Sequence, residues 1–243
     1  MTRARRRALV LACLIGLAVA AIGIAAIRTP PPKPQARPAS ERPALLLLTS
    51  LPLLFNEDFS LQGGGSPALT ALQSHYRVVP ISVADGAELA KGRLLLMAQP
   101  QAQAPENLVV LDQWVRRGGR LLLLADPLLE WPSKRPLGDL TRPPPMFADT
   151  GLLVHWGLKL DAPGRRGAGT RHLAGRKVLT ASPGTLHGTC DVQPDQLVAE
   201  CRVGGGRAMI VADADFMNVA QLGPGASENL DALLAALARL TGS

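Results

Sequence analysis

Three aspartates occupy positions at which α/β proteins commonly bind ligands. Asp126, Asp213 and Asp215 each follow a run of aliphatic residues that indicates a buried strand. The carboxyl ends of parallel strands meet at one edge of a sheet, and ligands of open α/β sheets bind at that edge. The pattern is compatible with a cation or sugar site. The simpler alternative, which we prefer from the sequence, is that these carboxylates accept hydrogen bonds from loop and helix amides.

Two cysteines are spaced for a covalent link. Cys190 and Cys201 lie eleven positions apart, with a turn expected at 193–196 between two short strands. Such a hairpin brings the two sulfurs together and predicts a disulfide in an oxidising compartment. Two free buried thiols and a metal pair are the alternatives. There is no Cys-x-x-Cys motif and no histidine at ligand spacing, so we expect no metal site.

Motifs for cofactor chemistry are missing. The glycine-rich stretch 63–66 lacks the Gly-Lys-Ser/Thr ending of a phosphate-binding loop, and no Gly-x-Ser-x-Gly elbow occurs. The histidines lack metal-ligand spacing, and we expect them at the surface or at helix ends: His75, His155, His172 and His187. The sequence therefore predicts no cofactor.

The elements that position these residues alternate between strand and helix. Aliphatic runs predict strands at 44–50, 77–81, 93–98 and 120–125. Ser66-Pro67 predicts a helix start, and a second helix is expected from Pro105 to the glycines at 118–119. Strands that alternate with helices indicate an α/β fold, with a mostly parallel sheet and helices on both faces.

The second half of the chain is more irregular. Asp149 is expected to cap a short helix that ends near His155, and the basic, glycine-rich stretch 163–176 is expected to be a loop. A β-rich insertion is expected around 163–203, followed by a core strand at 207–211. The last helix is expected to begin at Ser227, as its N-cap.

The amino-terminal segment indicates a membrane anchor. Four arginines within 3–7 precede an uncharged stretch at 8–27, which as a helix would be about 30 Å long, enough for one bilayer core. A cleaved signal peptide is the rival interpretation, because 18–20 has the A-x-A form. The predicted protein is single-pass in the bacterial cytoplasmic membrane, with a cytoplasmic tip and anchor at 1–27, a proline-rich linker at 28–43 and a periplasmic domain at 44–243.

Charge argues against a nucleic-acid partner. The formal net charge is +7, and residues 1–42 carry all of it, with eight basic residues and one glutamate. Residues 43–243 are neutral overall. A globular domain without excess positive charge lacks the basic surface that binds a phosphate backbone, so we expect no nucleic-acid binding.

Four stretches carry a family resemblance. They are LLLMAQP at 94–100, LDQWVRRGGRLLLLADP at 111–127, HWGL at 155–158 and GRAMIVADADFMN at 206–218. They resemble the periplasmic domains of gliding-motility-type proteins of uncharacterised ABC transport systems. The resemblance implies a class I glutamine amidotransferase-like (or flavodoxin-like) fold, and separate ATPase and permease chains as partners.

The resemblance also locates a missing nucleophile. Glutamine amidotransferases carry a cysteine on the turn after a central strand, and here that turn is Gln99-Pro100, which cannot supply a nucleophile. We therefore expect no catalytic residue and a non-enzymatic accessory domain of a transport or envelope system. Two alternatives remain open, namely a small-ligand binding domain and a hydrolase with an unrecognised site at the carboxyl edge of the sheet.

Overall fold

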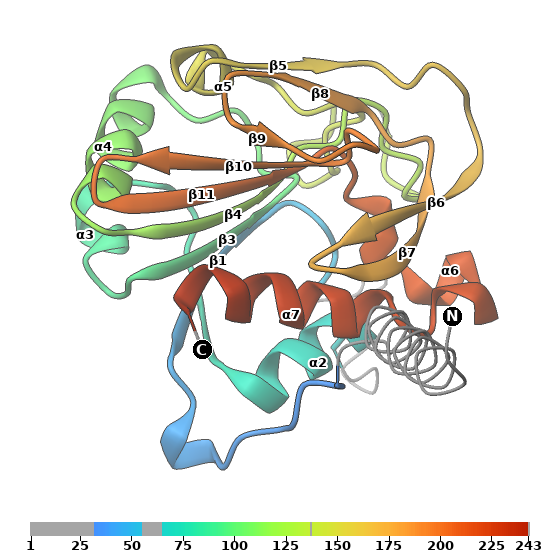
Figure 1. The fold of residues 1–243 in the computed structure, drawn as a ribbon, viewed down its shortest axis with the longest axis horizontal. Helices are drawn as coiled ribbons and strands as arrows, with labels where there is room; N and C mark the ends of the chain where they lie inside the picture. The colour runs from blue at the N-terminus through green and yellow to red at the C-terminus, as the bar shows by residue number, and fades with distance from the viewer. Residues whose placement is uncertain (1–31, 55–64, 137, 243) are drawn as a thin grey trace, which may run out of the picture. The chain divides into compact units, whose positions relative to one another are not determined.

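The computed structural model describes residues 32–54, 65–136 and 138–242. From Lys33 onward the chain forms one compact unit. It is a mixed α/β unit built on a seven-stranded sheet of order β2-β1-β3-β4-β11-β10-β9 (Figure 1). The sequence-based prediction of an α/β fold with a mostly parallel sheet is confirmed at this level.

Five adjacent strands of the sheet run parallel. They are β2 (Arg77–Pro80), β1 (Ala44–Thr49), β3 (Leu94–Ala98), β4 (Arg120–Leu124) and β11 (Gly206–Val211). The interior strands are runs of aliphatic residues because both faces of the sheet are covered. Pro80 cannot donate to a ladder hydrogen bond, and β2 accordingly lies at the edge.

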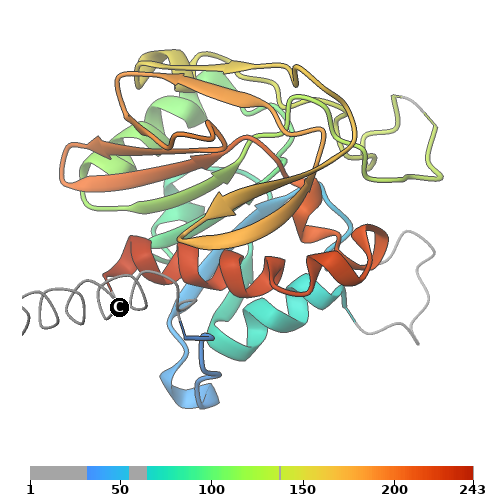
Figure 2. The ribbon, with the colours of Figure 1, turned by 45° about the vertical axis from the view of Figure 1, so that its right-hand side comes forward.

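Helices cover both faces of the sheet. On one face α2 (Pro67–His75) and α7 (Asn229–Thr241) lie side by side, as Figures 1 and 2 show. Leu72 and Leu237 pack there against alternate strand residues such as Leu47. On the other face α3 (Gly86–Leu89) and α4 (Pro105–Arg116) pack on the intervening residues, with Leu111 and Val115 in the core.

Local signals place most helix ends. The Ser66 side chain accepts a hydrogen bond from the Leu69 amide at 3.1 Å, and Gly118 ends α4 with a φ of 105°. The last helix differs from the expectation that Ser227 caps it. Ser227 instead follows the short helix η3 (Pro224–Ala226), and α7 begins after Glu228 without a side-chain cap.

The region 150–203 adds short strands to the parallel unit. The short helix α5 (Leu152–His155) follows Gly151, and Asp149 Oδ1 accepts hydrogen bonds from the amides of Gly151 and Leu153. Three antiparallel pairs follow: β5 (Leu158–Asp161) with β8 (Thr185–Gly188), β6 (Ala168–Leu173) with β7 (Arg176–Ala181), and β9 (Asp191–Val192) with β10 (Val198–Val203).

Strand β6 lies within the region expected to be β-rich but differs from the loop expected over 163–176. In β6 only Leu173 is buried, so its polar residues give no alternating apolar pattern. Between β11 and α7 lie η2 (Asp215–Met217), α6 (Val219–Leu222) and η3. At the other end, η1 (Ala39–Glu41) belongs to a segment that contacts α2, where the Arg37 amide donates to Ser74 O.

The predicted location in the bacterial cytoplasmic membrane is corrected. Within the described ranges, no helix is both long and apolar enough to cross a membrane. The longest of them, α7, has 13 residues, whereas a span needs about 20. The stretch 8–27, on which the prediction rested, lies outside the described residues.

The disulfide is confirmed. Cys190 and Cys201 are bonded, with their Cα atoms 4.9 Å apart. The bond joins the residue before β9 to β10, and Gln193 N donates to Val198 O across the predicted turn. It therefore fixes the antiparallel edge of the sheet.

We predict that reduction of this bond lowers the free energy of unfolding by about 3 kcal/mol, because an eleven-residue separation is no longer closed in the unfolded chain. Urea unfolding with and without a dithiol reductant measures the effect. A Cys190→Ala/Cys201→Ala variant should not respond to the reductant. Three thiols that react in denatured, non-reduced protein, instead of the single thiol of Cys13, would contradict the pairing.

Candidate functional site

The structure brings the three predicted aspartates together at the carboxyl edge of the sheet. Asp126 follows β4, and Asp213 and Asp215 follow β11; all three side chains are buried. Asp126 Oδ2 accepts from Ala214 N at 2.8 Å, and Asp213 Oδ1 accepts from Phe216 N at 2.7 Å. Their hydrogen bonds go to loop and helix amides. That they bind a ligand stays a prediction.

Burial raises the pKa of all three carboxyls. It raises the pKa of Asp126 to about 6, with a contribution from the charge of Glu130. It raises the pKa of Asp215 to about 7, helped by the charge of Asp126. For Asp213 burial and the charges of the other two aspartates together raise the pKa well above its ordinary value. Asp215 is therefore about half protonated near neutral pH, whereas Asp126 is mostly ionised there.

Residues 127–136 and 138–147, here called the covering segment, close over this edge. Asp215 Oδ2 accepts from Glu130 N at 2.7 Å, and Phe147 N donates to Asp126 O at 2.6 Å. Ser182, which is fully buried, donates its hydroxyl to Glu130 Oε1 at 2.6 Å. Near its two ends the covering segment is thus hydrogen-bonded to the edge beneath it, at Glu130 and at Phe147.

The turn after β3 lies under the same segment. Gln99 has a φ of 44°, a conformation that residues other than glycine rarely adopt. Its amide nitrogen donates to Pro144 O at 3.1 Å, and its amide oxygen accepts from Asp126 N at 2.9 Å. Gln99 therefore joins the ends of β3 and β4 to the covering segment.

A larger open cavity lies at the opposite end of the sheet, beside β10. Its volume is about 600 Å³, within the usual range for small-molecule sites. Its lining residues come from the ends of α4 and α5, from the 188–191 region and from β10: Arg116, His155, Trp156, Gly157, Thr189, Cys190, Asp191, Glu200, Cys201, Arg202, Val203 and Gly204. We call it the side cavity.

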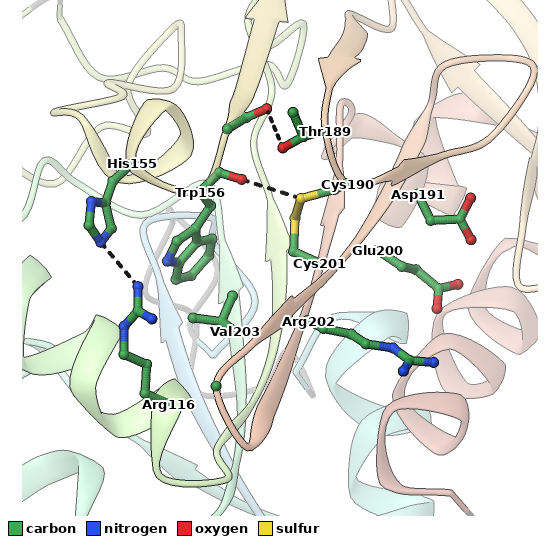
Figure 3. A pocket seen from close by; sticks show the side chains of 12 residues that line it. Arg116, His155, Trp156, Thr189, Cys190, Asp191, Glu200, Cys201, Arg202 and Val203 are labelled. Carbon is green, nitrogen blue, oxygen red and sulfur yellow. Dashed lines mark hydrogen bonds between the residues drawn. A yellow bond between two sulfur atoms is a disulfide. The ribbon is translucent and has the colours of Figure 1, made fainter.

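Figure 3 shows how its side chains are arranged. Arg116 and His155 point toward each other on one wall, with Trp156 and the disulfide beside them. Asp191, Glu200 and Arg202 project to the other side of β10, as alternation along a strand requires. Glu200 is paired there with Arg239 of α7 at 2.9 Å.

One carboxylate of α4 holds that wall in place. Asp112 Oδ2 accepts from Arg116 Nε at 2.7 Å, and Asp112 Oδ1 accepts from Trp156 Nε1 at 2.8 Å. His155 Nε2 lies 3.6 Å from the same Oδ1. Burial acts to raise the pKa of Asp112, but the hydrogen bonds from Arg116 and Trp156 outweigh it and lower the pKa. We call these four residues the Asp112 cluster.

The Asp112 cluster presents hydrogen-bond donors to the side cavity. Arginine can only donate, so in the 3.3 Å contact between Arg116 Nη2 and His155 Nε2 the histidine nitrogen is the acceptor. A guanidinium group has five N–H donors, and the contacts with Asp112 and His155 use two of them, so Arg116 leaves donors for a ligand with acceptor atoms.

Sequence reasoning missed the side cavity. One signal was present, because Asp112 and Arg116 are four residues apart on a predicted helix and so share a face. The packing of α5 and of the β9–β10 pair against that face could not be derived from the motifs. Two other histidines contact single aspartates, His172 with Asp195 and His187 with Asp161. In the part of the chain that the structure describes, no group of three metal-ligating residues occurs.

Comparisons with known proteins give structural likeness only. No protein-family model and no curated protein matches the sequence. Among solved structures, an exo-β-1,4-mannosidase from Opitutaceae bacterium strain TAV5 is 13% identical at a TM-score of 0.47, covering 81% of this chain and 36% of that one. A β-galactosidase from the Antarctic haloarchaeon Halorubrum lacusprofundi is 14% identical at a TM-score of 0.47, and the match covers 84% of this chain and 31% of that one. A putative ThuA-like protein from Parabacteroides merdae is 10% identical at a TM-score of 0.39, and the match covers 84% of this chain and 91% of that one.

These findings correct one prediction. The expectation that the chain is not an enzyme is contradicted, because glycosidases stand among the solved structures that resemble it. We do not carry that interpretation forward. The chain spans about a third of the length of those glycosidases. With identities of 13–14% and TM-scores of 0.47, the glycosidase activity is not assigned to this chain. The resemblance to gliding-motility-type domains stays a prediction.

We predict that the protein is more stable at pH 5 than at pH 8. The folded-state pKa of the buried carboxyls is raised, so the stability they contribute is complete below about pH 4 and is lost as pH rises through about 6 to 7. The expected loss is about 2–4 kcal/mol between pH 5 and pH 8.

Urea unfolding at a series of pH values tests this prediction. Asp215→Asn should flatten the profile, whereas Asp191→Asn, which changes an exposed carboxyl of β9, should leave it unchanged. A profile that rises from pH 5 to pH 8, or one that Asp215→Asn does not alter, would show that these carboxyls do not govern the pH response.

Proposed function

We propose that this chain is a small-molecule binding domain whose ligand occupies the side cavity. The observation that carries the proposal is the Asp112 cluster. One half-buried carboxylate fixes an arginine, a histidine and a tryptophan at the wall of an open cavity of about 600 Å³. Binding sites need a few polar groups held in place before the ligand arrives.

The chemistry of the wall defines what such a ligand must carry. Arg116 offers N–H donors, and both carboxylate oxygens of Asp112 already accept hydrogen bonds from the protein. A ligand therefore places an acceptor group, such as a carboxylate, phosphate or carbonyl, against this wall. The Trp156 indole and the disulfide supply an adjoining apolar surface.

A second candidate function, hydrolysis at the carboxyl edge, is favoured by one specific contact. The Ser182 hydroxyl donates to Glu130 Oε1 at 2.6 Å, and Ser182 has a φ of 51°. A carboxylate so placed can take the proton of an attacking serine, and Asp215, with a pKa of about 7, can donate one near neutral pH. Ser182 is fully buried, so this reaction requires the covering segment to move aside.

For the binding function we predict that Asp112→Asn weakens binding at least about tenfold. The amide cannot pair with the Arg116 charge, so the arginine is no longer held toward the cavity. Titration calorimetry with hits from a thermal-shift panel of small carboxylates, phosphates and carbonyl compounds measures this. Glu228→Gln is the control, because this exposed carboxyl lies just before α7 and does not line the side cavity. Unchanged affinity in Asp112→Asn, or no hit in the panel, would contradict the proposal.

For the hydrolase candidate, Ser182→Ala and Asp215→Asn should each reduce turnover of a chromogenic ester or glycoside by about a hundredfold or more. Asp191→Asn should leave turnover unchanged. If the wild-type chain turns over none of these substrates, or the two variants keep the wild-type rate, Ser182 and Asp215 do not carry out hydrolysis.

A further inference from the structure

A second hollow adjoins the side cavity. It has a volume of about 360 Å³ and lies between α4 and α5, lined by Pro105, Leu108, Val109, Asp112, Thr150, Gly151, Leu152 and His155. We call it the α4–α5 groove. Its wall is mostly apolar, and Val109 is 56% exposed to solvent. His155 lines both hollows, Asp112 lines the groove, and Arg116 and Trp156 line the side cavity, so members of the Asp112 cluster line both.

The two hollows have opposite chemistry. The groove offers aliphatic contacts from Leu108, Val109 and Leu152. His155 lines the groove as well, and Arg116, which contacts His155 at 3.3 Å, lines the side cavity with its N–H donors. A molecule that satisfies both must carry an apolar chain and, at one end, a group rich in acceptors.

Resting on the binding function proposed above, we infer that the ligand is a linear amphiphile with a carboxylate head. The head lies against Arg116 and His155 in the side cavity, and the alkyl chain lies along α4 in the α4–α5 groove. Charge complementarity favours a carboxylate, because the fork of N–H groups of arginine matches the two oxygens of that group. Burial of the chain covers Val109, an apolar residue that is otherwise exposed.

The test is a titration series of hexanoate, octanoate and decanoate with the whole chain, at concentrations below micelle formation. Each CH₂ group that enters the groove should tighten binding by up to about fourfold. Octanol, which has the chain without the charge, should bind more weakly than octanoate.

Two substitutions separate the head from the chain. Arg116→Gln should weaken every alkanoate by the same factor, about tenfold or more, and leave the dependence on chain length intact. Val109→Asn should reduce the dependence on chain length and keep the preference for octanoate over octanol. Arg117→Gln and Leu140→Asn are the matched controls, since both residues are exposed and neither lines the two hollows. Because the whole chain is used, any binding outside the site is common to all variants.

The outcomes are distinct. Affinities that do not depend on chain length, or that fall equally in Arg117→Gln and Arg116→Gln, would overturn the inference. If small carboxylates or phosphates bind in the side cavity but alkanoates bind no better than acetate, the amphiphile fails and the binding function stands. If no compound of either kind binds, both fail.

Discussion

Burial of both faces of the parallel strands β1, β3, β4 and β11 is the constraint on which the rest of the structure depends. Their aliphatic side chains pack on α2 and α7 on one side and on α3 and α4 on the other. Each fully buried leucine contributes about 1.5–3 kcal/mol, and the strands have no room for polar side chains. Polar chemistry is consequently confined to the ends of the strands and to the antiparallel edge.

The two ends differ in accessibility. At the carboxyl edge Asp126, Asp213 and Asp215 are buried under the covering segment, and amide donors satisfy them. At the other end the β10–β11 turn, α5 and the disulfide surround an open cavity. The carboxylate of Asp112, at intermediate depth, aligns the side chains of its wall. Ligands of open α/β sheets usually bind at the carboxyl edge, whereas the side cavity lies at the other end of this sheet.

The sequence predicts elements whose signals are local. Runs of leucine mark the buried strands, Ser66-Pro67 and Pro105 mark helix starts, and the spacing of Cys190 and Cys201 indicates their bond. The sequence does not predict features that depend on how distant elements pack together. Strand β6 carries almost no buried residue, and the Asp112 cluster forms only when α5 docks on α4. The turn at Gln99 was placed correctly, whereas its bonds to the covering segment depend on contacts 45 residues away.

The most direct test of the central claim is residue-resolved mapping of a bound ligand by amide chemical shifts. Assigned spectra are recorded while any small acceptor-bearing compound that stabilises the protein is titrated in. The account predicts saturable shifts that centre on Arg116, His155, Trp156 and Thr189, around the side cavity. Shifts that centre instead on Ser182 and the covering segment would contradict it and would place the site at the carboxyl edge.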